Sequence, residues 1–382
     1  MSAMVSFMRM ASSGHGDSAW SAFLQQVGSG IGRNRAGSAD SDSLSPSDWV
    51  RVEQLGRAHR VTPLLAAGIK ATNATPPDDV AARIRDASDA NKYVVLRQLG
   101  ELRRIVGRLD AAGVPYILLK GPAVSAYARR EHALRQMNDL DIAVSVDGIG
   151  SFEEILSDLG YVPTVVGIEN LTTLTALREG GNEAPFRNPR RATTVEIHWD
   201  FFANKSLYPQ SIDDEIAEAV VLDIEGIGVR TMSAERKFAY VCVHGAKHHW
   251  RRIKWLCDVA MLLEAETIQV AKAWEYACRL GVGDLVAEAI WMTENVLGLP
   301  VADTGIASFH APPTRRRLAT LEHGWLDVKA TATMGSRSDA ISTACSAISR
   351  SDPISHSNAP VSPRWRRRST SRSPWIRWLC VW

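Results

Sequence analysis

The sequence predicts an α+β protein, with a small mixed β-sheet and flanking helices over residues 110–205 and a helical module after it. Two observations predict this class. Short apolar or alternating runs typical of buried strands occur at 114–120, 139–145 and 193–199. Segments with the apolar spacing of helices lie before these runs, between them and from residue 233 onward.

The composition is that of an ordinary globular protein. The chain has 382 residues, of which 45% are hydrophobic and 23% charged, so more than one module is expected. It contains neither a spanning run of about 18 apolar residues nor the apolar stretch of a secretion signal, and we expect a soluble, cytoplasmic protein without a membrane partner. The five cysteines are scattered, which favours reduced, buried thiols over a disulfide framework.

The N-terminal third is predicted to contain a flexible segment and then a helical module. Residues 1–45 are rich in Gly and Ser and are expected to be flexible. The helical N-terminal module covers 46–109: Ser47 or Asp48 caps a first helix, and Pro63 opens a second. A longer helix over 80–109 is expected to bury one side, with apolar residues at Tyr93, Leu96, Leu99, Leu102, Val106 and Leu109.

The α/β core is predicted over residues 110–205. The run 114–120 is a buried strand that ends at Gly121, and Pro122 suits the first turn of the helix that follows. The segment 139–145 alternates as a strand, a helix follows over 148–159, and 193–199 forms a further strand.

A helical module is expected over 206–325, and the segment 326–382 differs from everything before it. Residues 331–382 contain eight Arg and two Asp but no Lys or Glu, so they carry +6 and residues 1–330 carry −4. We expect a disordered or aberrant Ser/Arg/Trp-rich tail, of the kind that a shifted reading frame near Ala330 would produce. Such a tail can contact the phosphates of nucleic acid, whereas the mildly acidic charge of residues 1–330 does not indicate a nucleic-acid partner.

Asp139 and Asp141 are the strongest local signal for chemistry. Residues two apart in a strand project from the same face, so both carboxylates can meet one or two hard cations. Glu196 alternates with buried residues on a later strand, from which it could face the same pocket. The alternative to a metal site is a solvent-exposed strand face on which the two aspartates have no function.

Lys120, Gly121 and Arg135 are the candidates for phosphate binding. Lys120 is a compact charge beside Gly121, where a backbone turn and a helix N-terminus can approach a phosphate. Arg135 is suited equally to a triphosphate and to a carboxylate partner. Asp258 is either a polar group in a cleft or a satisfied core residue, and a basic group beside two tryptophans suits an acidic acceptor or a solvated helix end: Arg251, Arg252 and Lys254.

The chain has, in order, a strand, a glycine turn with a helix, a strand with two aspartates, and a later strand with one glutamate. This order resembles the nucleotidyltransferase fold related to DNA polymerase β, and more closely the uncharacterised bacterial nucleotidyltransferase family. The resemblance covers about residues 46–300 and rests on Leu118–Gly121, Arg135, Asn138–Ile142, Glu196–Trp199, His244–Trp250 and Trp255–Asp258. It implies an enzyme that moves a nucleoside monophosphate from a nucleoside triphosphate such as ATP to an unknown acceptor hydroxyl, with release of pyrophosphate. Mg²⁺ (or Mn²⁺) would be held by Asp139, Asp141 and Glu196, with Glu196 also a candidate base, and the nucleotide by Lys120, Gly121 and Arg135.

Two features favour other interpretations. Pro122 stands where the superfamily commonly has Ser and brings neither an N–H nor a hydroxyl, which leaves open a nucleotide-binding or interaction protein without turnover. His244 and His248 lie one helical turn apart, as zinc ligands can, but the Glu of an H-E-x-x-H motif is missing. Structural histidines are therefore expected there.

Overall fold

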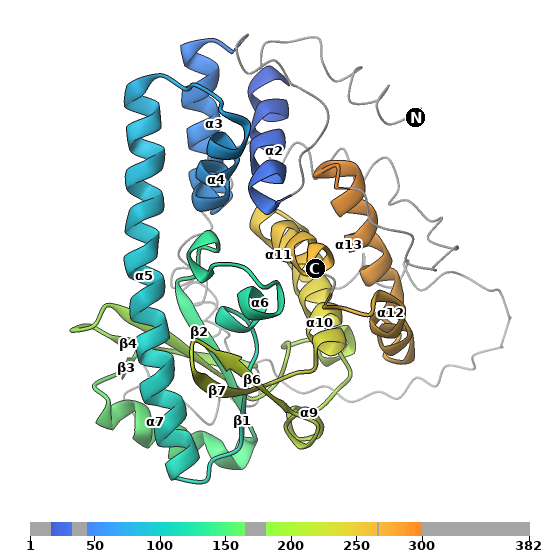
Figure 1. The fold of residues 1–382 in the computed structure, drawn as a ribbon. Helices are drawn as coiled ribbons and strands as arrows, with labels where there is room; N and C mark the ends of the chain where they lie inside the picture. The colour runs from blue at the N-terminus through green and yellow to red at the C-terminus, as the bar shows by residue number, and fades with distance from the viewer. Residues whose placement is uncertain (1–16, 33–43, 165–180, 266, 300–382) are drawn as a thin grey trace, which may run out of the picture. The chain divides into compact units, whose positions relative to one another are not determined.

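The computed structural model describes residues 17–32, 44–164, 181–265 and 267–299, and the predicted tail 326–382 lies outside these ranges. Its helices and strands form an α+β fold around one mixed sheet, as predicted (Figure 1). No helix in the described ranges is long and apolar enough to cross a bilayer.

The sheet has seven strands in the order β3-β4-β5-β2-β1-β7-β6. The predicted strands are present as β1 (Tyr116–Leu118), β2 (Asp139–Val144) and β5 (Thr193–His198). At the centre, β2 pairs with β1 antiparallel and with β5 in parallel, which makes the sheet mixed.

The remaining strands are β3 (Val162–Pro163), β4 (Glu183–Asn188), β6 (Val220–Ile224) and β7 (Ile227–Thr231). The predicted helical module over 206–325, of which 300–325 lies outside the described ranges, did not include the last two strands, which form a hairpin. Glu225 and Gly226 between them both have positive φ (53° and 73°), the backbone of a tight two-residue hairpin turn. The hairpin joins the sheet through β7, which runs parallel to β1.

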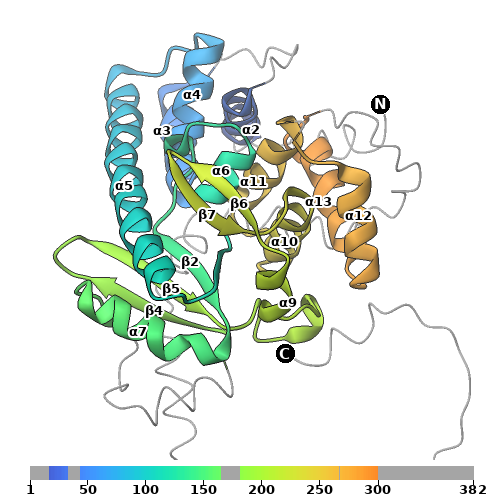
Figure 2. The same cartoon turned by 60° about the horizontal axis from the view of Figure 1, so that its bottom comes forward.

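Two helices cover one face of the sheet, α5 (Asp78–Ala111) and α7 (Ile149–Asp158) (Figures 1 and 2). Leu102 and Val106 of α5 pack with Ile142 of β2 and Val195 of β5 in one apolar cluster. Tyr93 and Leu96, predicted to be on the buried side of α5, are instead 73% and 64% exposed. The predicted positions from Tyr93 to Leu102 recur every three residues, whereas an α-helix has 3.6 residues per turn. They therefore move around the 34-residue helix instead of staying on one side.

The other face of the sheet turns toward a second apolar cluster, which includes Ile117, Leu119 and Ala143. This cluster joins N-terminal to C-terminal helices. The N-terminal ones are α2 (Asp17–Ile31), α3 (Pro46–Ala58) and α4 (Thr62–Thr72), and the C-terminal ones are α10 (Ala234–Lys247), α11 (Ile253–Glu264), α12 (Val270–Arg279) and α13 (Gly283–Val296). Short helices complete the fold: α6 (Pro122–Tyr127) and α9 (Ile212–Ala217).

The helix α2 corrects the prediction of flexibility over 1–45 for residues 17–31; residues 1–16 and 33–43 lie outside the described ranges. Its buried apolar residues recur at helical spacing: Trp20, Phe23, Val27 and Ile31. Its neighbour is α4, and the two backbones come so close that a Cβ on Gly68 would lie 1.7 Å from the carbonyl oxygen of Gln26. Gly in these helices therefore permits close packing, where the composition suggested mobility.

The predicted N-cap of α3, Ser47 or Asp48, is not the observed one. Ser45 is the N-cap, and it forms a capping box with Asp48.

Candidate active site

The turn after β1 presents Lys120 at the edge of the sheet. Gly121 has a φ of 65°, a left-handed conformation that glycine adopts without strain, and Pro122 then opens α6 as predicted. A buried lysine holds the preceding backbone, because Nζ of Lys237 donates to the carbonyl oxygens of Leu118, at 2.8 Å, and of Leu119. These two hydrogen bonds from Lys237 therefore hold the backbone directly before Lys120 in place.

The parallel register of β2 and β5 brings the predicted carboxylates together. Asp139 pairs with Thr194, Asp141 with Glu196, and Ala143 with His198. Because side chains alternate along a strand, Asp139, Asp141, Glu196 and His198 all lie on the sheet face that turns toward the C-terminal helices.

Three of these side chains form a group suited to a metal ion. Asp141, Glu196 and His198 each offer a ligand atom, and these atoms lie within 4.8 Å of one another. Nε2 of His198 is 3.3 Å from Oδ1 of Asp141 and 3.6 Å from Oε2 of Glu196. In the described part of the chain this is the one such group, and Asp139 is not a member of it. His198 was not predicted as a ligand.

The polar atoms of this group are close in space but poorly aligned for hydrogen bonding. Oδ1 of Asp141 and both ring nitrogens of His198 are buried, and none has an aligned hydrogen-bond partner among the described residues. Buried polar atoms without such partners are costly, and a bound cation would satisfy Oδ1 of Asp141 together with Nε2 of His198. Two carboxylates and an imidazole fit Mg²⁺ or Mn²⁺, with the nitrogen favouring Mn²⁺ over Mg²⁺.

Lys120 supplies the positive charge that faces this group. Its Nζ lies 2.7 Å from Oδ1 of Asp141, and the two side chains are 15% and 4% exposed. Burial disfavours both charges, but their mutual attraction outweighs it: the pKa of Lys120 is raised well above its ordinary value, and Lys120 with His198 holds the pKa of Asp141 far below its own. The pair is thus ionised over the physiological range.

The carboxylates of Glu196 and Asp139 are harder to ionise than that of Asp141, whereas His198 is easier to protonate than an ordinary histidine. Burial, together with the charges of Asp141, Asp139 and Glu183, raises the pKa of Glu196 to about 7. Burial and the charge of Asp141 raise the pKa of Asp139. For His198 burial disfavours the imidazolium cation, but the neighbouring carboxylates of Asp141 and Glu196 outweigh burial and raise the pKa to about 9. The site concentrates negative charge that cations neutralise.

Glu183, on the unpredicted strand β4, is a further acidic residue at this site. Its Oε2 lies 3.5 Å from Nδ1 of His198, opposite which it is placed by the antiparallel register of β4 and β5. The carboxylate contacts the ring nitrogen that faces away from Asp141. Carboxylates in this position commonly orient a ligating imidazole. Pro185 in the same strand obscured the strand pattern in the sequence.

Arg135 pairs with a carboxylate, which is one of the two alternatives that the sequence left open. Its Nε lies 2.8 Å from Oδ1 of Asp258, and its Nη2 lies 2.9 Å from Oδ2, so the contact is bidentate. Both side chains are less than a tenth exposed. Asp258 belongs to α11, and the pair therefore joins the loop before β2 to the C-terminal helices.

The helices α10 and α11 bring basic and aromatic groups toward the acidic face. The charges of Lys120 and Lys254 partly offset the raised pKa of Asp139, and the charges of His198, Lys120 and Lys247 lower the pKa of Glu183 against burial, so both lysines of these helices act on the site through their charge. Burial and the charge of Arg135 lower the pKa of Lys254 to about 8. The rings of His248 and Trp255 stack at 4.6 Å and 11°, and neither His244 nor His248 belongs to a group of possible metal ligands among the described residues.

Comparisons with known proteins place these observations in a family. A family model described as "Uncharacterised nucleotidyltransferase" matches residues 45–298. Among solved structures, the chain is similar to the antibiotic-resistance factor ANT(2'')-Ia, with 17% sequence identity, a TM-score of 0.32, and coverage of 48% of this chain and 94% of that one. A search of curated proteins found no match.

Proposed function

The chain belongs to the uncharacterised nucleotidyltransferase family, and from this premise we propose that it transfers a nucleoside monophosphate group from a nucleoside triphosphate to an acceptor hydroxyl, with release of pyrophosphate. One observation carries the proposal: Asp141, Glu196 and His198 converge within 4.8 Å on the sheet face beside Lys120. A carboxylate-rich site next to a basic turn suits phosphoryl chemistry, in which positioning and charge stabilisation supply most of the catalysis.

Asp141, Glu196 and His198 would hold a divalent ion, Mg²⁺ or Mn²⁺, and Asp139 would join them from the same strand face. Such an ion stabilises negative charge on phosphate oxygens and on the attacking hydroxyl. Glu183 would orient His198 through Nδ1, which leaves Nε2 directed at the two carboxylates. His198 and Glu183 thus extend the ligand set expected from the sequence.

Lys120 would have two partners in turn. Without a cation it neutralises Asp141 at 2.7 Å. When a metal ion takes over that carboxylate, the ammonium becomes available to the triphosphate, which Gly121 lets approach the backbone closely. Glu196 would either share the metal ion or, from the same face, orient the acceptor hydroxyl and accept its proton.

Arg135 serves this proposal as a positioning residue. Its guanidinium is engaged at both ends by Asp258, so it would hold α11 against the site instead of binding the nucleotide. Lys247 and Lys254, on α10 and α11, would then offer charge to the phosphates or to an anionic acceptor.

Mn²⁺ binding provides the first test. Electron paramagnetic resonance of bound Mn²⁺ should give a saturable site in the wild type that weakens at least about tenfold in Glu196→Gln and in His198→Ala, since each removes one of three ligands. Lys272→Gln, an exposed change on α12, is the matched control. Equal affinity in all four proteins would exclude this metal site.

A nucleotide-binding protein without turnover is the second candidate. Two observations favour it: Pro122 supplies no N–H at the first turn of α6, and the ammonium of Lys120 is already paired with Asp141. Metal-dependent pyrophosphate release from a nucleoside triphosphate separates the two candidates, because only the transferase produces it.

A further inference from the structure

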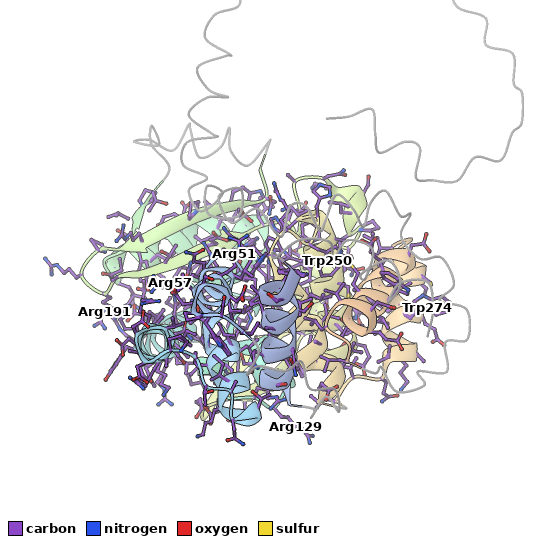
Figure 3. The ribbon with its side chains drawn as sticks, turned by 90° about the horizontal axis from the view of Figure 1, so that it is seen from above. Arg51, Arg57, Arg129, Arg191, Trp250 and Trp274 are labelled. Atoms are coloured by element: carbon purple, nitrogen blue, oxygen red, sulfur yellow. The ribbon has the colours of Figure 1, made fainter. Side chains whose placement is uncertain are left out.

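A basic pocket lies on the opposite face of the sheet from the acidic group. It is formed between α5 and the turn that joins β4 to β5, and its volume is about 490 Å³. Four arginines and one glutamate line it: Arg97, Arg104, Arg190, Arg191 and Glu101. Arg191 lies on the side of the molecule away from Trp274 of α12 (Figure 3). This volume lies within the range of small-molecule sites.

A buried carboxylate fixes two of the guanidinium groups. Oε1 of Glu101 lies 2.9 Å from Nη1 of Arg104 and 3.1 Å from Nη1 of Arg191. Its Oε2 accepts a hydrogen bond of 2.8 Å from the hydroxyl of Tyr161. Glu101 is 2% exposed, so both oxygens are committed within the protein. The two arginines are thereby held in place with further N–H donors to spare, because each guanidinium has five.

The pocket carries an excess of positive charge. Four guanidinium groups against one carboxylate leave a formal charge of +3. Arg97 and Arg190 are both exposed and have no ion-pair partner among the residues that the structure describes. Like charges gathered in a concave surface repel one another and favour an anion of matching charge.

We propose that this pocket binds a short chain of phosphates with a charge of about −3 to −4, in a nucleoside polyphosphate or in inorganic polyphosphate. Guanidinium groups match phosphate oxygens in geometry and charge. The inference is independent of the proposed transferase activity, because it involves neither the acidic group nor Lys120.

Isothermal titration of the full-length protein with inorganic tripolyphosphate, and separately with ADP, tests the pocket. The buffer contains EDTA, so that the acidic group carries no metal ion and repels phosphates. The variant is Arg97→Gln/Arg190→Gln, because these exposed side chains have no partner whose loss would disturb the fold. Arg85→Gln/Lys272→Gln removes two exposed charges outside the pocket and is the matched control.

We expect tripolyphosphate to bind the wild type and the control equally, and the pocket variant at least about 20-fold more weakly, since two charge-assisted contacts are lost. Comparable binding of ADP would identify a nucleotide as the source of the phosphates, and binding of tripolyphosphate alone would identify inorganic polyphosphate. Undetectable binding to the wild type, equal binding to the pocket variant, or binding lost in Lys120→Ala would overturn the assignment.

Discussion

Nζ of Lys120 lies 2.7 Å from Oδ1 of Asp141, at the junction of the turn after β1 and the face of β2. The two residues are 21 positions apart and are brought together by the antiparallel pairing of β1 and β2. Because both are largely buried, each depends on the other for its charge. Asp141 therefore stabilises the fold in the absence of a metal ion, because it is the partner of Lys120. Asp139, the other aspartate of β2, has no such role.

Substitution of the two aspartates should therefore have opposite effects on stability. Asp141→Asn leaves Lys120 buried without its partner and should lower the free energy of unfolding by about 3–5 kcal/mol. Asp139→Asn removes a carboxylate whose pKa is raised by burial, so stability should be unchanged or higher. Urea unfolding at pH 7 in EDTA measures both, and equal losses in the two variants would refute the distinction.

Lys120→Ala should weaken binding of a nucleoside triphosphate by about 1.5–3 kcal/mol, the usual value for a hydrogen bond to a charged group. Adenosine, which has no phosphate, should bind almost as before. Titration calorimetry with ATP and adenosine in Mg²⁺ measures the difference. Parallel losses for both ligands would mean that the substitution damages the fold and that Lys120 does not bind phosphate.

Lys237 gives a prediction for the pH dependence of stability. Burial lowers the pKa of this lysine to about 7, whereas in the unfolded chain it is near 10.5. Between these values the unfolded state binds the extra proton, so stability rises with pH, and below pH 7 this contribution is constant. The stability difference between the wild type and Lys237→Met should shift in favour of the wild type by about 2 kcal/mol from pH 7 to pH 9.

Denaturant unfolding of both proteins at several pH values provides this test. Other titrating groups contribute to both proteins and cancel in the difference. A difference that does not change with pH would show that Lys237 stays charged throughout this range.

The packing of α2 on α4 gives a prediction with an internal control. Gly68→Ala places a methyl group against the carbonyl of Gln26 and should destabilise the protein by about 3 kcal/mol. Gly107→Ala, in the exposed part of α5 with no atom within 4 Å of its new Cβ, should stabilise it by about 0.5–1 kcal/mol. Thermal melting distinguishes them, and a neutral Gly68→Ala would argue against the contact.

Local patterns in the sequence predict the centre of the sheet well. The strands β1, β2 and β5 have apolar or alternating runs that depend on their own residues, so their positions and the shared face of Asp139 and Asp141 follow directly. Pro122 at the first position of α6 likewise has a local cause in its fixed φ.

Features that depend on distant partners are not predictable in this way. His198 becomes a candidate ligand only through the parallel register of β5 with β2, and Arg135 finds Asp258 123 positions away. The helix α2 was missed because its glycines suggested mobility, whereas a neighbouring helix uses one of them for close contact. In each case, tertiary packing determines the role of a residue that is ambiguous in the sequence.

The fate of the phosphates of the donor tests the central claim most directly. The protein is incubated with Mn²⁺, a cell extract as the source of acceptor, and ATP labelled either at the α- or at the γ-phosphate. We predict that the α-label moves onto a product while the γ-label leaves in pyrophosphate, and that Asp141→Asn and Glu196→Gln abolish both. Transfer of the γ-label, or transfer of the α-label that both variants retain, would contradict nucleotidyl transfer at this site.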